Sequence, residues 1–278
     1  MLFKTVAIYC VCDDFIRLLP CRDDPQCKMT TSEVMTVGLV AAMFYGGNIA
    51  LARKFLLLHG YFSRFLSHTR LLQRLLSIPL EIWEAVFHAL KAVLSHCFPS
   101  DHFIIDSCPI PVCLPCRSWR CRLYDGKQYL GYCASKKLYY YGLKIHLIIS
   151  SRGVPMEVIF TPASRADISG LRSMDLDLPP GSIIFGDRAY NSKALEDGLK
   201  AHAKIQLIPQ RRRKTKRPHS PPMQFLQKCN RRKVETAFGE IARLLPRSIQ
   251  ARTPKGFELR VFLFIFAYAI KLYCTAIK

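Results

Sequence analysis

The stretch 138–160 reads LYYYGLKIHLIISSRGVPMEVIF, and it predicts two extended segments joined by a tight turn. Along the first segment, apolar side chains alternate with Lys144 and His146, as on a strand with two unlike faces. Residues 151–153, Ser-Arg-Gly, interrupt the pattern, and the apolar run resumes at Val154. Two extended runs around a glycine-containing turn indicate a β-hairpin.

Short apolar runs on both sides of this hairpin predict further strands at 103–105, 182–185 and 205–208. We expect the first of them to end at Asp106, because Pro109 and Pro111 exclude a helix after it. The second ends at the pair Gly186-Asp187 in the same way. Segments with helical character lie at 166–171, 192–203 and 231–245. This order predicts an α/β fold, a mixed sheet with helices on both faces.

The first 98 residues have helical patterning instead. Thr31 or Ser32 is placed to cap a helix, and residues 46–48, Gly-Gly-Asn, are placed to turn it into a second helix at 49–58. We therefore predict a small all-helical region over 1–98 and a second domain over 99–278, which ends in a helix at about 255–275. The first region is compatible with a helix-turn-helix that binds DNA ends and equally with an ordinary helical bundle.

The charge of the chain points to a polyanionic partner. The chain has 41 Lys and Arg against 20 Asp and Glu, a formal net charge of +21. From Lys200 to Lys278 nineteen basic residues stand against three acidic ones, a net +16. A phosphate backbone is the commonest partner of such a surface, whereas anionic membranes and acidic proteins are the alternatives.

The twelve cysteines do not form a recognisable pattern of disulfides or zinc ligands. Cys113 and Cys116 form a CxxC with Cys121 nearby, but no second CxxC or CxxH follows at zinc-ribbon spacing. Because the chain is long and no signal peptide is recognisable, we expect a reducing compartment.

Two apolar stretches raise the question of a membrane. Val34 to Ala52 has nineteen residues without a charge, but the polar turn at 46–48 interrupts it. Val261 to Ile270 has ten, which is too short to span. We expect packed helices and no membrane partner.

The segment 210–222 reads QRRRKTKRPHSPP and predicts a basic loop, because like charges and prolines disfavour regular structure. Six of its residues from Arg211 to Arg217 are positively charged, which suits an arm that follows DNA as well as a solvated loop. The following helix carries an apolar stripe with Glu235 beside it.

Three acids at the ends of predicted elements are the most informative feature. Asp106 and Asp187 end apolar strands, and active residues gather at the carboxyl ends of strands in open sheets. Glu235 lies on the helix after the basic loop. Carboxylates are the preferred ligands of Mg²⁺, and two such ions about 4 Å apart can assist cleavage of a phosphodiester.

Each acid alone also has a structural explanation. Asp106 and Asp187 are typical turn residues, and Glu235 has a helical partner in Arg231 at i−4. Their joint placement, two strand ends and one helix in a basic region, favours a shared site over three independent structural roles.

Several segments resemble the DDE transposases of bacterial insertion sequences, with the insertion-sequence 982 group as the closest match. They are IIDS at 104–107, YGLKIHL at 141–147, FGDRAY at 185–190 and RRKVE at 231–235. The order and spacing of these motifs carry the resemblance, which extends over nearly the whole chain.

The resemblance implies an RNase H-like catalytic domain in which Asp106, Asp187 and Glu235 are the catalytic, metal-binding acids. It implies two Mg²⁺ or Mn²⁺ ions, no organic cofactor, and a homo-oligomer that acts on terminal inverted repeats and target DNA. The bacterial cytoplasm, in association with the nucleoid, is the expected location.

Basic residues near these motifs are predicted to bind DNA. They are Lys144, His146, Arg188, Arg211, Arg212, Arg213, Lys214, Lys216, Arg217, Arg231 and Arg243. His146 has a second interpretation as a packed, hydrogen-bonded residue. Tyr190 is compatible with stacking on a base and with a place in the core.

The leading hypothesis is thus a transposase that catalyses metal-dependent DNA cleavage and strand transfer at insertion-sequence ends. The first alternative is a catalytically inactive DNA-binding protein derived from a transposase. The second is an RNase H-like nuclease that cuts without joining.

Overall fold

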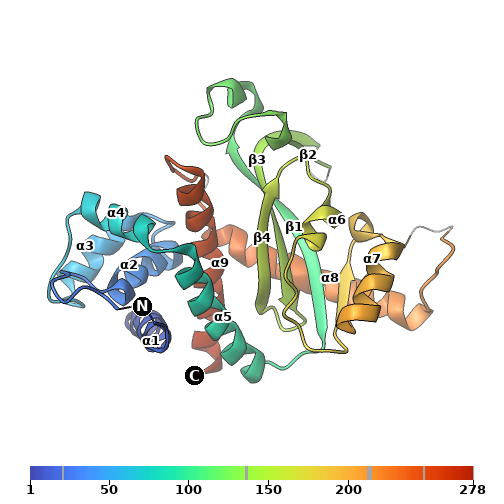
Figure 1. The fold of residues 1–278 in the computed structure, drawn as a ribbon, viewed down its shortest axis with the longest axis horizontal. Coiled ribbons are helices and arrows are strands. Elements are labelled where there is room, and N and C mark those ends of the chain that lie inside the picture. The colour runs from blue at the N-terminus through green and yellow to red at the C-terminus, as the bar shows by residue number, and fades with distance from the viewer. Residues whose placement is uncertain (21, 135–136, 212–214, 247, 278) are drawn as a thin grey trace. The chain divides into compact units, whose positions relative to one another are not determined.

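The computed structural model describes the chain except for residues 21, 135–136, 212–214, 247 and 278 (Figure 1). It contains two compact units. Unit 1 joins Met1–Cys97 with Glu240–Lys278, and unit 2 is Phe98–Gly239. We predicted that the C-terminal helix belongs with the strand-containing domain; the structure instead groups it with the N-terminal helices.

All the regular elements that the structure describes in unit 1 are helices. Its helices are α1 (Leu2–Leu18), α2 (Thr31–Phe44), α3 (Ile49–Leu58), α4 (His68–Ser77), α5 (Leu80–Cys97) and α9 (Pro254–Ala276). The cap of α2 is Thr30 and not Thr31 or Ser32, because Thr30 and Glu33 bond each other's backbone N–H groups in a capping box. The turn at 46–48 and helix α3 lie where we predicted them.

The apolar character of α9 explains why it packs in unit 1. Its side chains are buried on nearly every side from Val261 to Ile270, so it needs neighbours all round. The Phe87 ring on α5 lies 5.2 Å from the Phe262 ring and 5.5 Å from the Phe266 ring. Aromatic burial of this kind stabilises the helix in its place among the N-terminal helices.

Helix α9 is also long and apolar enough to cross a membrane by length and composition, with a mean hydropathy of 1.6. We predicted that its apolar run is too short, but the helix continues on both sides of that run. In the structure 67% of its most apolar window is buried by protein, as in core helices that pass the same test. Helices α2 and α3 pass it only together, and they are bent by 110° at their break.

Unit 2 is built on a six-stranded mixed sheet. Its strands are β1 (His102–Cys113), β2 (Leu130–Cys133), β3 (Leu138–Ser150), β4 (Pro155–Pro162), β5 (Ile183–Gly186) and β6 (Gln206–Pro209). The order is β2-β3-β1-β5-β6, with β4 also paired to β3. Strands β5 and β6 run parallel to each other, and β5 runs parallel to β1. A mixed sheet flanked by helices is the class that the sequence predicts.

The hairpin of β3 and β4 forms as predicted. Ile145 pairs with Phe160 and Leu147 with Val158, so apolar side chains from both strands share one face. Lys144 and His146 lie on the other face, because side chains alternate along a strand.

Strand β1 differs from our prediction, since it continues past Asp106 and through both prolines. It pairs with β3 from Phe103 to Cys113, but with β5 only over residues 102–104. Proline cannot donate to a ladder and is tolerated where one side of a strand has no partner. Asp106 therefore lies two residues past the end of the β1–β5 pairing, and the strand continues beyond it.

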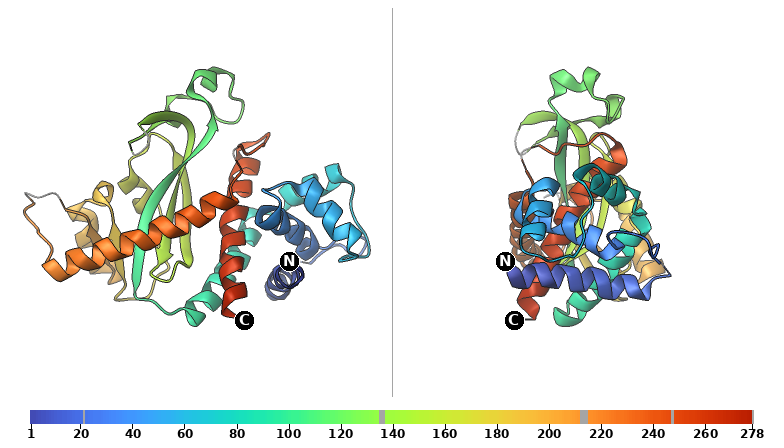
Figure 2. Two further views of the ribbon diagram at one scale, coloured as in Figure 1. Left: turned by 180° about the vertical axis from the view of Figure 1, so that it is seen from behind. Right: turned by 90° about the vertical axis from the view of Figure 1, so that its left-hand side faces the viewer.

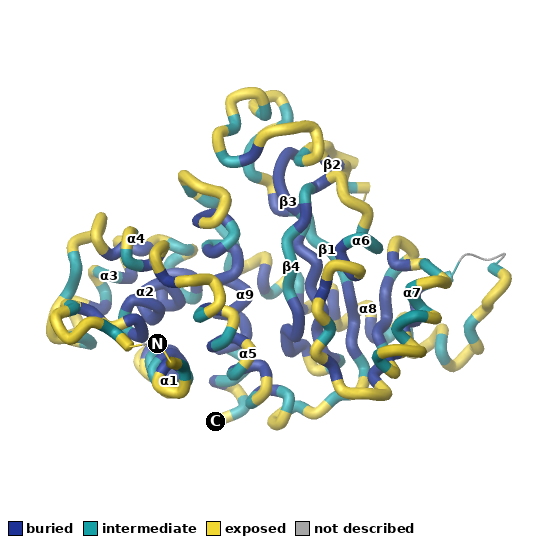
Figure 3. Tube along the Cα trace, viewed as in Figure 1, coloured by how far each residue is buried: buried dark blue, intermediate teal, exposed yellow. Residues whose placement is uncertain are grey.

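Helices cover both faces of this sheet. The two short helices α6 (Asp167–Arg172) and α7 (Lys193–Gly198) lie on one face, and α8 (Pro221–Leu244) crosses the opposite face (Figures 1 and 2). The strands between them form the buried centre of the unit (Figure 3). Helix α8 begins ten residues earlier than predicted, because Pro221 and Pro222 occupy its first turn, where proline needs no N–H partner.

Candidate active site

The parallel pairing of β1 and β5 brings the two aspartates to one level of the sheet. Ile104 on β1 pairs with Phe185 on β5. Asp106 lies two residues after Ile104, and Asp187 lies two residues after Phe185. The two carboxylates consequently follow the last paired residues of neighbouring strands, where the sheet opens.

Both aspartates line one pocket of unit 2, with a volume of about 360 Å³. Strands β1 and β5 form one wall, helix α8 forms another, and the segment after β6 closes it. The polar lining residues are Asp106, Asp187, Gln210, Arg211, Thr215, His219, Gln224, Gln227, Lys228 and Arg231. The pocket thus combines two acids with three cations.

Gln227 holds α8 against the strand ends that form the pocket. Its Nε2 atom donates to the carbonyl oxygens of Gly186 and Ile208, at 3.1 Å each. These carbonyls belong to β5 and β6, so one side chain joins the helix to both strands. Nothing in the local sequence pattern distinguished Gln227 from other polar residues of the helix.

Burial perturbs both carboxylates. It raises the pKa of Asp106 to about 6, which the Ser107 N–H group and Arg231 oppose and the Asp187 carboxylate reinforces. Burial likewise raises the pKa of Asp187, against the N–H of Ala189 and the Arg231 guanidinium. Two neighbouring acids whose charged forms are disfavoured are typical of a functional site.

Backbone hydrogen bonds orient the two carboxylates. The Ser107 N–H group donates to Oδ1 of Asp106 at 2.8 Å. The Ala189 N–H group donates to Oδ1 of Asp187 at 2.8 Å, which caps the short 3₁₀ helix Arg188–Tyr190. Each side chain is therefore fixed by a backbone N–H group one or two residues further along the chain.

Glu235 lies on α8 and contacts Arg231 instead of the aspartates. Nε of Arg231 donates to Oε1 of Glu235 at 3.2 Å, and the Glu235 side chain is 61% exposed. Glu235 is absent from the residues that line the described pocket, whereas Arg231 is among them. The structure brings Asp106, Asp187 and Arg231 together in one pocket. Glu235 is connected to them only through its contact with Arg231.

A fourth acid, Asp167 at the start of α6, is part of the surroundings of this site. Its Oδ1 accepts hydrogen bonds from Nζ of Lys144 at 2.8 Å and from Oγ of Ser107 at 3.1 Å. Its charge also raises the pKa of Asp106 and of Asp187. The helix predicted at 166–171 places Asp167 near its start, where an acid is favourable, and its position after the β3–β4 hairpin was the available signal.

His146 and Tyr190 are buried on the same face of the sheet. His146 is 0% exposed, with Nε2 at 2.9 Å from Oγ1 of Thr161 and Nδ1 at 3.4 Å from the Tyr190 hydroxyl. Burial lowers the pKa of His146 to about 4, so the ring is neutral at pH 7. Neither ring is exposed for contact with DNA in this conformation. Both residues are packed in the core, which is the second interpretation that the sequence allowed.

The predicted basic arm divides into two described parts. Arg211 forms a buried ion pair with Glu196 and donates to Oδ1 of Asn191 at 2.7 Å. Arg217 pairs with Asp197 at 2.8 Å on the surface, and Lys216 is exposed. Arg212, Arg213 and Lys214 lie outside the described residues.

The other predicted DNA ligands are distributed over both units. Arg188 follows Asp187 directly and is exposed. Lys144 is engaged by Asp167, with 18% of its side chain exposed. Arg243 is exposed in the last turn of α8, in the part that belongs to unit 1.

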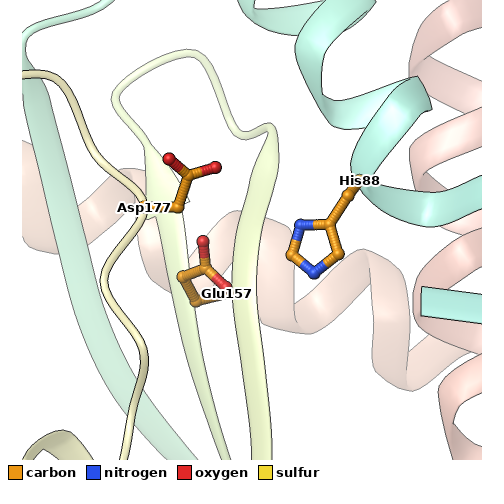
Figure 4. Close-up of side chains that lie close together, drawn as sticks. All are labelled: His88, Glu157 and Asp177. Atoms are coloured by element: carbon orange, nitrogen blue, oxygen red, sulfur yellow. The ribbon is translucent and has the colours of Figure 1, made fainter. Parts of the chain in front are cut away.

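Two further acids of unit 2 lie near each other. Carboxylate oxygens of Glu157 on β4 and of Asp177 after α6 lie within 4.8 Å (Figure 4). His88, which is also labelled there, belongs to unit 1. Neither acid lines the pocket of Asp106, so this pair is separate from the candidate site. No disulfide joins the cysteines in the described part of the chain.

Comparison with known proteins agrees with this geometry. A family described as "Transposase DDE domain" matches residues 98–270, which include the whole described sheet and helix α8. No curated protein matches the chain. Because the match covers more than half of the sequence, the chain belongs to the DDE transposase family, whose members act on DNA with divalent metal ions.

Proposed function

We propose that this transposase cuts DNA at the ends of an insertion sequence and joins the freed 3′ ends to target DNA. In our proposal the element is similar to the insertion-sequence 982 group, and the catalytic domain is RNase H-like. Water would attack the scissile phosphate first, and the 3′-hydroxyl would then attack the target strand.

The observation that carries the proposal is the meeting of Asp106 and Asp187 in one pocket with Arg231 and Lys228. Carboxylates alone would repel a DNA phosphate. Guanidinium and ammonium groups in the same pocket supply the charge that attracts it, and arginine can bind phosphate with two parallel hydrogen bonds.

The two aspartates fit divalent metal ions. Burial raises both pKa values, so a cation at this place would relieve the cost of their charge. We propose Mg²⁺ or Mn²⁺, two ions, with Asp106, Asp187 and Glu235 as ligands. Bound metal would activate the attacking oxygen and stabilise the leaving one. Glu235 would first have to exchange its bond with Arg231.

We also propose that the helices of residues 1–98 bind the terminal repeats. Lys54, Arg64 and Arg70 are exposed on α3, α4 and the segment between them. Arg53 is already engaged, since its Nε donates to the Leu66 carbonyl at 2.7 Å. The protein would act as a homo-oligomer in the bacterial cytoplasm, in association with the nucleoid.

Metal-dependent nicking of DNA that carries the element's ends tests the enzymatic proposal. We expect nicks with Mg²⁺ or Mn²⁺, and their loss in Asp106→Ala, Asp187→Ala and Glu235→Gln. Asp175→Ala, at an exposed acid outside the pocket lining, is the matched control and should keep activity.

Two results would decide against the proposal. An inactive wild-type protein whose carboxylate variants bind DNA equally well would identify a DNA-binding derivative. Nicking without joined product from precleaved 3′ ends would identify a nuclease.

A further inference from the structure

The end of the sheet beyond Asp106 carries an exposed projection, which we call the sheet tip and define as residues 113–134 and 137–139. It contains the short 3₁₀ helices Pro115–Arg120 and Lys127–Tyr129 and strand β2. Most of its described residues are exposed (Figure 3). The proposed catalytic chemistry uses none of its residues.

Large apolar side chains gather on the sheet tip at unusually high exposure. They are Leu114, Trp119, Leu130, Tyr132, Leu138 and Tyr139. Trp119 is the largest of them and is 75% exposed. A cluster of exposed apolar residues at one place marks an interaction site more often than chance exposure does.

The Trp119 ring is held in a fixed orientation. Its Nε1 donates to the carbonyl oxygen of Cys116 at 3.1 Å. The guanidinium of Arg120 lies 4.2 Å from the ring centroid, a cation–π contact. An edge bond and a cation against the ring keep the indole extended into solvent, ready to stack on another flat group.

A second aromatic platform lies on the adjoining strands. Tyr132 on β2 and Tyr139 on β3 are cross-strand partners, and their ring centroids are 4.9 Å apart. They are 54% and 63% exposed. The sheet tip thus presents three exposed aromatic rings.

The charge of the sheet tip selects its partner. Its described cations are Arg117, Arg120, Arg122, Lys127 and Lys137, whereas Asp125 is its one described acid. A second sheet tip packed against this one would bring the same positive charge and be repelled. Aromatic rings among arginines suit a nucleic-acid strand, whose bases stack and whose phosphates attract cations.

We propose that the sheet tip binds an unpaired segment of the DNA substrate, with one base stacked on Trp119 and neighbouring phosphates on its arginines. This inference rests on the proposed function for the source of the DNA. Cys113 lies seven positions after Asp106 along β1, about 23 Å at 3.3 Å per residue. That distance corresponds to roughly seven stacked nucleotides at 3.4 Å each.

Tryptophan fluorescence of the full chain tests the proposal directly. The chain has two tryptophans, and Trp83 is 0% exposed, so quenching by DNA would report on Trp119. We expect a 20-nucleotide oligo(dT) to quench the wild-type emission and a duplex of equal length to quench it less. Trp119→Phe should remove the quench.

The anisotropy of fluorescein-labelled oligo(dT) measures the affinity of the same proteins for this strand. We expect Trp119→Phe to bind nearly as the wild type does, since a stacking ring remains, and Trp119→Ala to bind about 10-fold more weakly. Phe3→Ala, at an exposed aromatic of α1, is the matched control. To test the cations, we compare the oligo(dT) affinity of the double variant Arg117→Ala/Arg122→Ala with that of Arg152→Ala. Arg152 lies at the exposed β3–β4 turn of the same sheet.

No quench at saturating DNA, or equal affinity in Trp119→Ala, overturns the proposal. So does a change of oligomeric state in Trp119→Ala without a change in DNA binding. Failure of the proposed function is distinguishable, because Asp187→Asn should lose nicking while its quench persists. A wild type that never nicks but shows a Trp119-dependent quench would refute only the enzymatic proposal.

Discussion

Nε of Arg231 lies 3.2 Å from Oε1 of Glu235, one turn along α8, and the same guanidinium opposes the rise that burial causes in the pKa values of Asp106 and Asp187. One side chain thus connects all three acids of the proposed site. Its position between them makes Arg231 the most direct test of how the third acid joins the other two.

Replacement of Arg231 should slow cleavage. We expect Arg231→Ala to lower the nicking rate roughly 100-fold, in the range seen when one donor to a transition state is removed, and Arg231→Lys to lower it less. Without the guanidinium the pKa of Asp106 rises further, so the acid side of the pH–rate profile should move to higher pH. Equal rates in Arg231→Lys and Arg231→Ala would show that charge at this position is unimportant.

The pKa of Asp106 makes stability depend on pH in the metal-free protein. Because burial raises this pKa to about 6, the folded state binds the proton more tightly than the unfolded state does. The contribution of Asp106 to the stability of the folded state should therefore become less favourable as pH rises from about 4 to about 6, and it should stay constant above pH 6.

Asp106→Asn removes the cost of burying a charged carboxylate. At pH 7 this variant should therefore be more stable than the wild type, by at most about 3 kcal/mol. Urea unfolding without divalent ions measures the difference. Added Mg²⁺ should narrow it by stabilising the wild type. A less stable Asp106→Asn protein at pH 7 would argue against a buried, charged carboxylate.

The contact of Asp167 with Lys144 should be worth more than a surface ion pair, since both side chains are less than one-fifth exposed. We expect Asp167→Asn to destabilise the fold by about 1–3 kcal/mol, because the ammonium loses its charged partner. A double-mutant cycle with Lys144→Met measures the coupling. If the changes in unfolding free energy of the single variants add up to that of the double variant, the two residues act independently.

Gly170 is required by a close approach of α6 to His146. A Cβ atom there would lie 2.6 Å from the His146 ring, so Gly170→Ala should displace the ring and cost about 1–3 kcal/mol. Gly198→Ala is the matched control, because nothing lies within 4 Å of its Cβ position and alanine favours a helix. Thermal unfolding compares them, and equal melting temperatures would contradict the packing of α6 on β3.

Much of the strand pattern was predictable from local sequence. The hairpin at 138–160 and the strand before Asp187 formed because period-two alternation and turn residues act over a few residues. The end of β1 was not predictable, since Pro109 and Pro111 are tolerated only because β5 stops pairing at Ile104. That circumstance depends on a strand some eighty residues away in the sequence.

The sequence by itself determined the alternation of strands and helices, the basic charge and the identity of the acids, because these depend on residue type and short spacing. Tertiary structure alone decided which groups meet. It placed Asp106 beside Asp187 through the β1–β5 register and added Asp167 through α6. It also buried His146 and left Glu235 outside the lining of the pocket that the two aspartates share. Such contacts arise from packing between segments distant in the chain, which no local pattern encodes.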